Sequence, residues 1–298
     1  MRTGGGGAST VSRDDRRAPR DELLARLRAG SGNRPRVSPS LAGGLRAWLE
    51  DAAAELVIAR GEGAPPLFLG PRLVEAALPR PPEPRHRPVP TSIDTALSCL
   101  VHVVFRHVAS IGPSLVAPSL DPGDVGRRRG ALLDHALAAL SVDPARGDVV
   151  ALVHSFDDGQ RRELAEALHT HVEHLCRLTP QFVPSWLPRT DDRVSIPLAG
   201  GRIMLTGVFD LLVGAPVPDT ATVCALGVSA GGRWQELRAG LHYLALLETL
   251  RTGCPPFRLA LIHSGVGRYD VEDVRSSHLV AMTEHVATVL GAMAGRGA

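Results

Sequence analysis

Lysine is absent from the 298-residue sequence, and its place as the basic residue is taken by 33 arginines. This absence excludes a Schiff base, a lysine-containing phosphate-binding loop and any nuclease site that depends on a lysine. Cysteine is scarce as well, since the four cysteines are widely spaced and form no CxxC pair. That spacing argues against a structural zinc site and for free thiols in a reducing compartment.

Long apolar runs are also missing. No stretch approaches the roughly 20 residues that cross a bilayer, and no apolar segment near the N-terminus has the pattern of a secretory signal. The formal net charge is only +2, and the hydrophobic content of 44% is enough for a sizeable core. Overall charge therefore favours neither a nucleic acid nor a membrane as partner. We expect a cytoplasmic protein with no membrane partner.

Composition divides the chain into three regions. Residues 1–40 are polar and rich in Arg and Gly, which predicts a disordered tail and linker with one short helix over 21–28. Residues 41–90 predict a small helical subregion that ends in a proline-rich connector. Residues 91–298 are expected to form the main domain.

Changes in hydrophobic period predict the order of elements in the main domain. Helical spacing gives way to a period of two at residue 193, and the LAGGR turn then indicates a β-hairpin. The predicted segments are helices over 91–111, 126–140 and 160–178, strands over 194–196, 203–213 and 222–228, a helix from 233, a strand over 257–263 and a helix over 270–290. We therefore expect an α/β (α+β) fold in which helices flank a mixed sheet.

Histidines and arginines on the predicted helices are expected to face solvent. His102, Arg106 and His107 fall on the polar side of the first helix of the main domain. His171 and His174 share a face three residues apart, but no third metal ligand is suggested beside them. We interpret His102, Arg106 and His107 as solvated, and His171 and His174 as solvated or partly buried.

Residues 207–210 read Gly-Val-Phe-Asp in an apolar strand, and a long helix carrying Tyr243 follows the next strand. This arrangement resembles the nuclease domain of the RecB and AddB type in the PD-(D/E)XK superfamily. There, one strand carries a GxxD motif, the next carries an acid and a lysine two residues apart, and the following helix carries a Gln four residues before a Tyr. The resemblance covers about residues 91–270 and implies a restriction-endonuclease-like core of helix, three strands, helix and strand.

The central motif of that family is missing here, because residues 221–232 contain no Asp, Glu or Lys. An acid and a lysine two apart on a strand point to the same face, where they bind a divalent metal and activate water. Small apolar side chains can do neither. The resemblance therefore implies a catalytically inactive domain that serves as a nucleic-acid-binding or scaffolding module and requires no cofactor.

Two alternatives stay open. An active DNA nuclease with Mg²⁺ or Mn²⁺ would use Asp134, Asp210 and Glu236 as catalytic carboxylates, with Asp134 and Asp210 as metal ligands. Asp134 lies four residues after Gly130, where the family has a metal-binding histidine, and Glu236 would replace the lost strand acid. The other alternative is a protein-interaction subunit that works with a helicase, a nuclease or another protein and does not contact nucleic acid.

Basic and polar residues at two helix starts are the candidates for contact with DNA. The first group precedes the helix over 126–140, and the second lies on the helix after the glycine turn. The candidates are Arg127, Arg128, Arg129, Arg233, Gln235, Arg238 and Tyr243. A solvated basic helix start, and core packing for Tyr243, are the competing interpretations.

Overall fold

The computed structural model describes residues 13–28, 34–61, 63–71, 74, 91–111, 125–142, 147–231 and 234–295. Its helices are α1 (Arg13–Arg28), α2 (Ser40–Arg60), α4 (Ser92–Ile111), α5 (Val125–Ser141), α6 (Gly147–His154), α7 (Asp158–Leu178), α8 (Trp234–Thr252) and α9 (Ser276–Ala294). Its strands are β1 (Leu67–Leu69), β2 (Arg189–Leu198), β3 (Ile203–Val213), β4 (Cys224–Ser229), β5 (Arg258–His263) and β6 (Arg268–Asp273).

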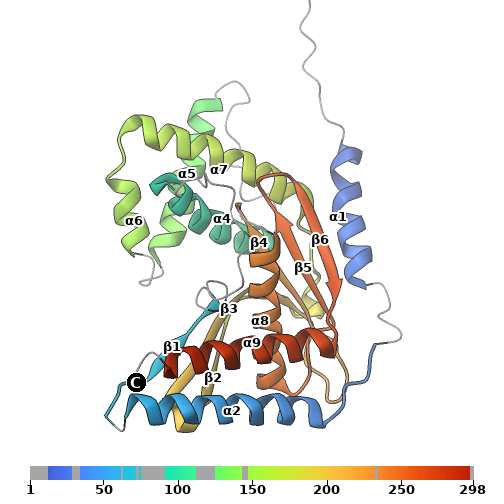
Figure 1. Cartoon of the computed structure of the whole chain (residues 1–298). Helices are drawn as coiled ribbons and strands as arrows, with labels where there is room; N and C mark the ends of the chain where they lie inside the picture. Colours follow the sequence, from blue (N-terminus) through green and yellow to red (C-terminus); the bar gives the residue numbers. More distant parts are fainter. Residues whose placement is uncertain are drawn as a thin grey trace, which may run out of the picture.

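The strands form one open mixed sheet in the order β1-β3-β4-β5-β6, with β2 paired to β3 as well. Neighbours β1/β3 and β4/β5 are parallel, whereas β2/β3, β3/β4 and β5/β6 are antiparallel. Helices cover both faces of this sheet (Figure 1). The α+β class and the predicted order of helix, three strands, helix and strand are confirmed.

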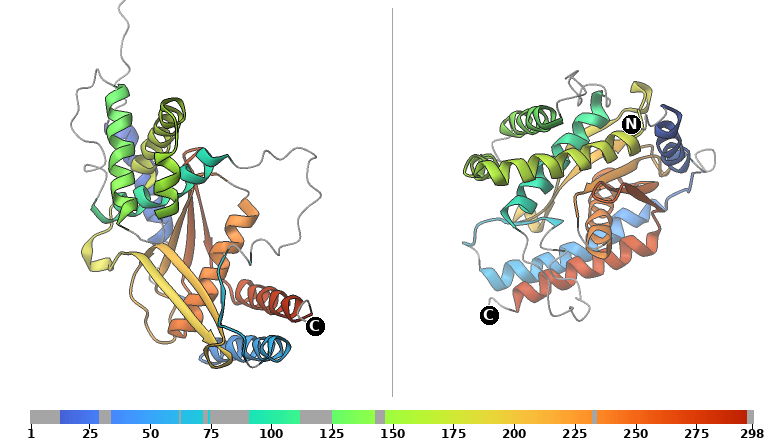
Figure 2. Two further views of the ribbon diagram at one scale, coloured as in Figure 1. Left: turned by 90° about the vertical axis from the view of Figure 1, so that its left-hand side faces the viewer. Right: turned by 90° about the horizontal axis from the view of Figure 1, so that it is seen from above.

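Helices lie on both faces of the sheet (Figure 2), and each face carries its own hydrophobic core. One core is built by α1, α4, α5, α6 and α7, and the other by α2, α8 and α9. Successive strand residues point to opposite faces, so Leu211 belongs to the first core and its neighbour Leu212 to the second. Strands β3, β4 and β5 therefore contribute to both cores.

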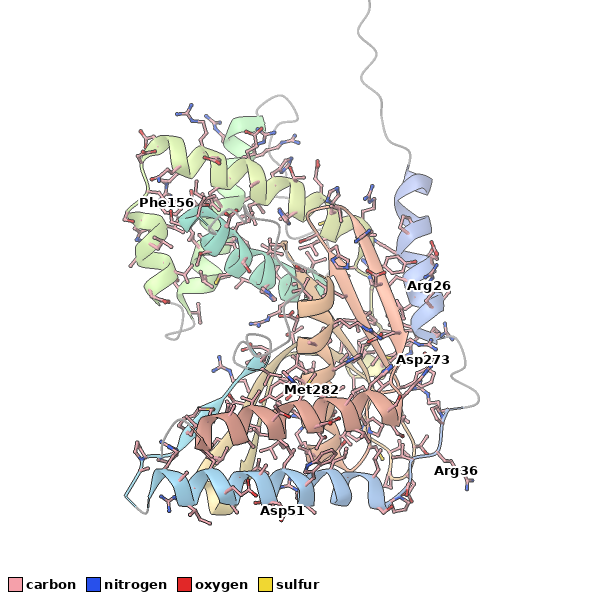
Figure 3. All side chains as sticks on the ribbon, viewed as in Figure 1. Arg26, Arg36, Asp51, Phe156, Asp273 and Met282 are labelled. Carbon is pink, nitrogen blue, oxygen red and sulfur yellow. The ribbon has the colours of Figure 1, made fainter. Side chains whose placement is uncertain are left out.

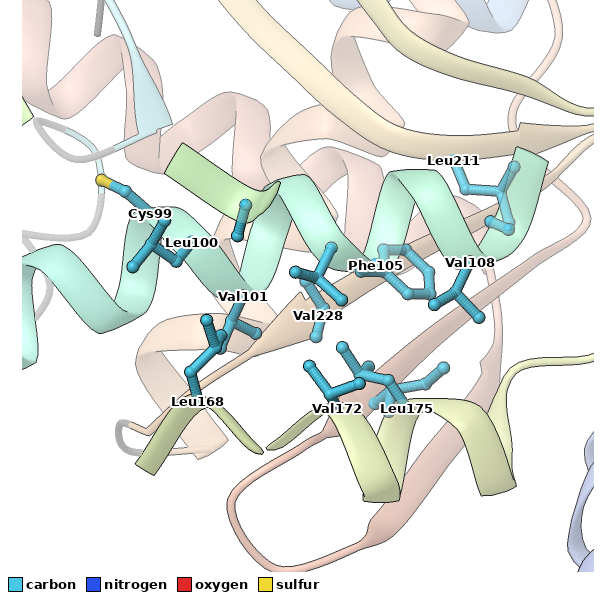
Figure 4. Close-up of a cluster of buried hydrophobic side chains, with 14 of the residues drawn as sticks. Cys99, Leu100, Val101, Phe105, Val108, Leu168, Val172, Leu175, Leu211 and Val228 are labelled. Atoms are coloured by element: carbon cyan, nitrogen blue, oxygen red, sulfur yellow. The ribbon is translucent and has the colours of Figure 1, made fainter. Parts of the chain in front are cut away.

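Helix α4 is held in the first core between α7 and the sheet. Figure 4 shows Phe105 and Val108 of α4 together with Leu175 of α7 and Val228 of β4. The helix begins with a reciprocal cap: the Asp94 N–H donates to Thr91 Oγ1 at 3.1 Å, and the Thr91 N–H donates to Asp94 Oδ2 at 2.8 Å. Packing and cap together fix the direction in which the polar side of α4 points.

The predicted helix over 270–290 is wrong at its start, because residues 268–273 form strand β6. The chain turns tightly after β5, with Gly267 at φ +66°, and then pairs back along β5. Backbone pairing across this turn outweighs the local helical pattern, and the helix begins only at Ser276. Strand β2 also begins earlier than predicted, at Arg189.

The predicted tail contains a longer helix than expected. Helix α1 begins at Arg13 rather than near residue 21, and Leu23 is fully buried. It packs on α7 and β6, and Arg26 lies over the ring of Tyr269 of β6 with its guanidinium carbon 5.5 Å from the ring centroid. Arg258 contacts both the Arg26 carbonyl and Asp273 at the end of that strand, and Arg26 and Asp273 are labelled in Figure 3. The second half of α1 is therefore packed on the rest of the protein, whereas residues 1–12 lie outside the described ranges.

The other predicted helices of the described chain are confirmed within a few residues. Helix α2 matches the predicted helix that opens the 41–90 region, and it packs lengthwise against α9. The proline-rich connector, residues 78–90, lies outside the described ranges. Among the helices that the structure describes, none combines the length and the apolar character needed to cross a membrane.

Candidate functional site

Asp210 lies where the sheet forks. Strands β1 and β4 share one edge of β3, because β2 occupies the other edge along nearly the whole strand. β1 pairs with residues 203–205 of β3 and β4 with residues 211–213, and no other strand of the described chain pairs with the stretch between them on that side. Asp210 fills part of this gap, because its Oδ2 accepts a hydrogen bond from the Val228 N–H at 3.2 Å. The carboxylate thus satisfies a backbone donor that the forked sheet leaves unpaired.

Two side chains of α4 hold the same carboxylate. His102 Nδ1 lies 2.8 Å from Asp210 Oδ1 and 3.0 Å from Oδ2, and Arg106 donates from Nε and Nη2 to Oδ1, each at 3.3 Å. His102 and Arg106 are four residues apart and therefore lie on one face of the helix. The expectation that they face solvent is wrong, because that face of α4 packs over the open edge of β3.

Arg106 also binds a second carboxylate that the sequence analysis did not single out. Its Nη1 lies 2.7 Å from Asp191 Oδ1. Asp191 falls opposite Asp210 in the β2/β3 register, between the pairs Thr190–Leu211 and Asp192–Phe209. Its φ of +55° is unusual for a residue other than glycine, although Asp tolerates it better than most. This local distortion of β2 brings two carboxylates onto one guanidinium.

Burial and charge act in opposite directions on Asp210, which is only 8% exposed. Burial would raise the pKa of its carboxyl, but His102, Arg106 and the Val228 N–H together lower the pKa below its ordinary value. Asp210 is therefore ionised at neutral pH, and its oxygens contact His102, Arg106 and the Val228 N–H. The site is an ion-pair network in which Asp210 is buried, Arg106 and His102 are half-buried, and the side chain of Asp191 is exposed.

Gly207 of the Gly-Val-Phe-Asp segment has a packing explanation. A Cβ at this position would lie 2.5 Å from Leu244 Cδ2 and 3.0 Å from Leu247 Cδ1, both on α8. Glycine therefore allows α8 to approach β3 closely. Both ends of the segment, Gly207 and Asp210, thus have structural roles in this fold.

The other candidate carboxylates are not gathered around Asp210 by any described contact. Asp134 on α5 has a side chain that is 72% exposed, and its ion pair is with Arg161 of α7 at 3.5 Å. The backbone of Glu236 lies in the first turn of α8, and its side chain is outside the described part. The structure thus joins Asp210 to Asp191, a residue that the sequence did not suggest, and places Asp134 in a separate surface pair.

The candidates for DNA contact are divided between surface and core. Arg129 pairs with Glu166 at 2.8 Å, and Arg238 pairs with Glu272 at 2.8 Å. Tyr243 is fully buried, and its hydroxyl donates to the Leu69 carbonyl at 2.8 Å. The Tyr243 side chain is thus packed in the core, which was the alternative to DNA contact for this residue. Arg127 and Arg128 lie in the first turn of α5, whereas Arg233 and the side chain of Gln235 are outside the described part.

The two histidines that share a face of α7 support the turn between β5 and β6. His171 Nδ1 lies 2.8 Å from Ser264 Oγ, and His174 Nδ1 lies 2.5 Å from the Ser264 carbonyl oxygen. Ser264 Oγ in turn donates to the Ser229 carbonyl at 2.8 Å, so it accepts from His171. His174 is half-buried, as expected, whereas His171 is buried rather than solvated or partly buried. Both histidines bind protein groups.

Among the residues that the structure describes, one group of three His, Cys, Asp or Glu side chains has ligand atoms close enough to share a metal ion. It consists of His242, Glu272 and His278, and it does not include Asp210. No protein-family model matches this chain, and no curated protein matches it either. Its function therefore has to be inferred from the geometry of these sites.

Proposed function

We propose that this chain is a catalytically inactive domain of the PD-(D/E)XK type that serves as a nucleic-acid-binding or scaffolding module. The observation that carries the proposal is the position of Arg106, which bridges Asp191 and Asp210. A nuclease metal needs carboxylate oxygens with free lone pairs. Here a guanidinium, which stays charged at any physiological pH, takes the place of the cation.

The strand next to Asp210 supports the same proposal. Strand β4 has the sequence Cys-Ala-Leu-Gly-Val-Ser and is buried along its length. None of its side chains can supply the second carboxylate or the general base that phosphodiester hydrolysis requires. A metal at Asp210 would have to displace Arg106 and His102 without gaining a new anionic ligand from this strand.

Cleavage assays test the absence of catalysis. We expect purified protein to leave linear duplex and single-stranded DNA intact with either Mg²⁺ or Mn²⁺. The matched control is Asp210→Asn, which removes the only candidate ligand on β3 and should behave like the unmodified chain. Metal-dependent cutting that disappears in Asp210→Asn would overturn the proposal and favour the active nuclease.

Salt dependence of DNA binding tests the nucleic-acid part. Each phosphate contact releases counterions, so log K should fall with log salt by about 0.9 per contact on duplex DNA. We expect the double variant Arg127→Ala/Arg128→Ala to bind more weakly and to show a shallower slope in fluorescence anisotropy. The control Arg36→Ala/Arg60→Ala removes the same charge from a different part of the surface.

A protein partner in place of DNA is the second candidate. It is favoured by the internal pairing of Arg129 and Arg238 with glutamates and by the burial of Tyr243, because these residues then have less to offer a phosphate backbone. Equal, salt-insensitive DNA binding by the unmodified chain and both double variants would leave scaffolding as the function to pursue.

A further inference from the structure

A second polar cluster lies on the other face of the sheet, where α8, β6 and α9 meet. Glu272 of β6 pairs with Leu259 of β5, whose side chain belongs to the core beneath α8 and α9. Paired residues on neighbouring strands point to the same face, so Glu272 points toward those helices. His242 comes from α8, and His278 comes from the first turn of α9. Three separate elements thus each contribute one side chain.

The three side chains are already in contact. His242 Nε2 and Glu272 Oε1 form a short hydrogen bond, while the rings of His242 and His278 stack with centroids 4.7 Å apart and planes at 17°. One possible ligand atom from each residue lies within 4.8 Å of the other two. The side chains of His242 and Glu272 are 13% and 20% exposed, so the cluster is mostly buried but open to solvent.

One atom of this cluster is left without a partner. His278 Nδ1 is buried and has no hydrogen-bond partner, as donor or acceptor, within the described part of the chain. A buried polar atom without a partner is costly, and such atoms in native proteins commonly mark a missing water or ion. An ion bound at this cluster would give His278 Nδ1 the partner that it lacks.

We propose that His242, Glu272 and His278 form a binding site for a divalent transition metal, with Zn²⁺ as the preferred ion. Two imidazole nitrogens and one carboxylate oxygen form a typical zinc ligand set, whereas Mg²⁺ and Ca²⁺ prefer sets made of oxygen atoms alone. Three protein ligands leave the fourth tetrahedral position open to water or to an external ligand. The inference does not depend on the function proposed for the Asp210 site, which lies on the opposite face.

Arg238 is the positioning residue of this site. Its Nε and Nη2 each lie 2.8 Å from Glu272 Oε2, whereas His242 contacts the other oxygen, Oε1. The carboxylate can therefore bind a metal through Oε1 while Arg238 holds Oε2. Outer contacts of this kind fix the orientation of a metal ligand. The hydrogen bond between His242 and Glu272 must open when the metal enters, and any proton held there is released.

Metal binding by untagged protein tests the proposal. Equilibrium dialysis against micromolar Zn²⁺ should give one bound ion per chain, and Zn²⁺ should raise the melting temperature because it binds only the folded form. The variants His278→Ala and Glu272→Gln should each weaken binding by at least about tenfold. His169→Ala, which removes a histidine of α7 paired with Glu173, should bind like the unmodified chain.

Cobalt spectroscopy separates this site from adventitious binding. Co²⁺ should produce the visible absorption of a four-coordinate nitrogen and oxygen site, and Zn²⁺ should displace it. Circular dichroism shows whether each variant folds. If His278→Ala does not fold, the near-isosteric variant Glu272→Gln still tests the site. Failure of the unmodified chain to bind Zn²⁺ at micromolar concentration, or equal binding by folded His278→Ala and Glu272→Gln, would overturn the proposal.

Discussion

At Asp210, stability and pH are coupled through the charges that surround a buried carboxylate. Its pKa in the folded protein is below the ordinary Asp value of about 3.9, because His102, Arg106 and the Val228 N–H outweigh the effect of burial. A group whose folded pKa is depressed stabilises the protein above its unfolded pKa, and this contribution is lost as the pH falls through the folded pKa. Asp210 thus contributes fully at neutral pH and progressively less in acid.

The variant Asp210→Asn tests this coupling. It should be clearly less stable than the unmodified protein at pH 7, and the difference should shrink as the pH falls from about 5 to below about 4. Urea unfolding at a series of pH values measures the difference directly. A difference that stays constant over this range would show that the charge of Asp210 has no part in its effect.

Arg106 has the larger expected effect on stability. Arg106→Ala leaves Asp210 buried without its guanidinium, and breaking a buried pair in this way costs about 3–5 kcal/mol. Arg106 is 17% exposed, so we expect a loss near the lower end of that range. Asp134→Ala is the matched control, because it breaks a pair whose carboxylate is 72% exposed and should cost at most about 1 kcal/mol. Similar losses for the two variants in urea unfolding would contradict the network described at Asp210.

At the scale of elements, the packing of helix α8 on strand β3 depends on the absence of a side chain at Gly207. Gly207→Ala inserts a methyl group against Leu244 and Leu247, and overpacking of this kind costs about 1–3 kcal/mol. Gly291→Ala on α9 is the control, because a Cβ there meets nothing within 4 Å and alanine favours helix. In thermal unfolding, the melting temperature should therefore fall for Gly207→Ala and stay level or rise for Gly291→Ala. A neutral Gly207→Ala would show that α8 can move away without loss.

Local patterns were sufficient to predict most elements but not their contacts. Helices α2, α4, α5 and α7 and the hairpin of β2 and β3 follow from periods of 3.6 and 2 in the sequence. Strand β6 could not be predicted in this way, because pairing with β5 across a tight turn decides its conformation. Tertiary pairing of this kind overrides local preference.

The candidate site shows the same limit. Asp210 was identified from its strand, whereas His102 and Arg106 have the spacing of any solvated helix face. Only the placement of α4 over the open edge of β3 distinguishes a helix face that binds Asp210 from one that faces solvent. Asp191 had no sequence signal at all, since it stands in an Asp-Asp pair within an irregular link, and its role depends on the register between β2 and β3.

For the molecule as a whole, the two cores share the central strands and should unfold together. Phe105 in the first core and Leu246 in the second are both fully buried, on opposite faces of the sheet. Truncation to alanine should cost about 3–5 kcal/mol for Phe105 and 2–5 kcal/mol for Leu246. Each variant should shift one common urea transition, followed by circular dichroism and by tryptophan fluorescence. Two separated transitions in either variant would show that the faces are independent.

The position of α1 beside β6 has a consequence for solubility. β6 is the last strand in the sheet order, and the outer edge of such a strand offers unpaired N–H and C=O groups to any other extended chain. The helix lies alongside it, anchored by Leu23 and by the hydrogen bond from the Arg258 side chain to the Arg26 carbonyl. A chain that lacks residues 1–28 would expose the edge of β6 to intermolecular β-pairing. We therefore expect it to aggregate before the central fold is lost.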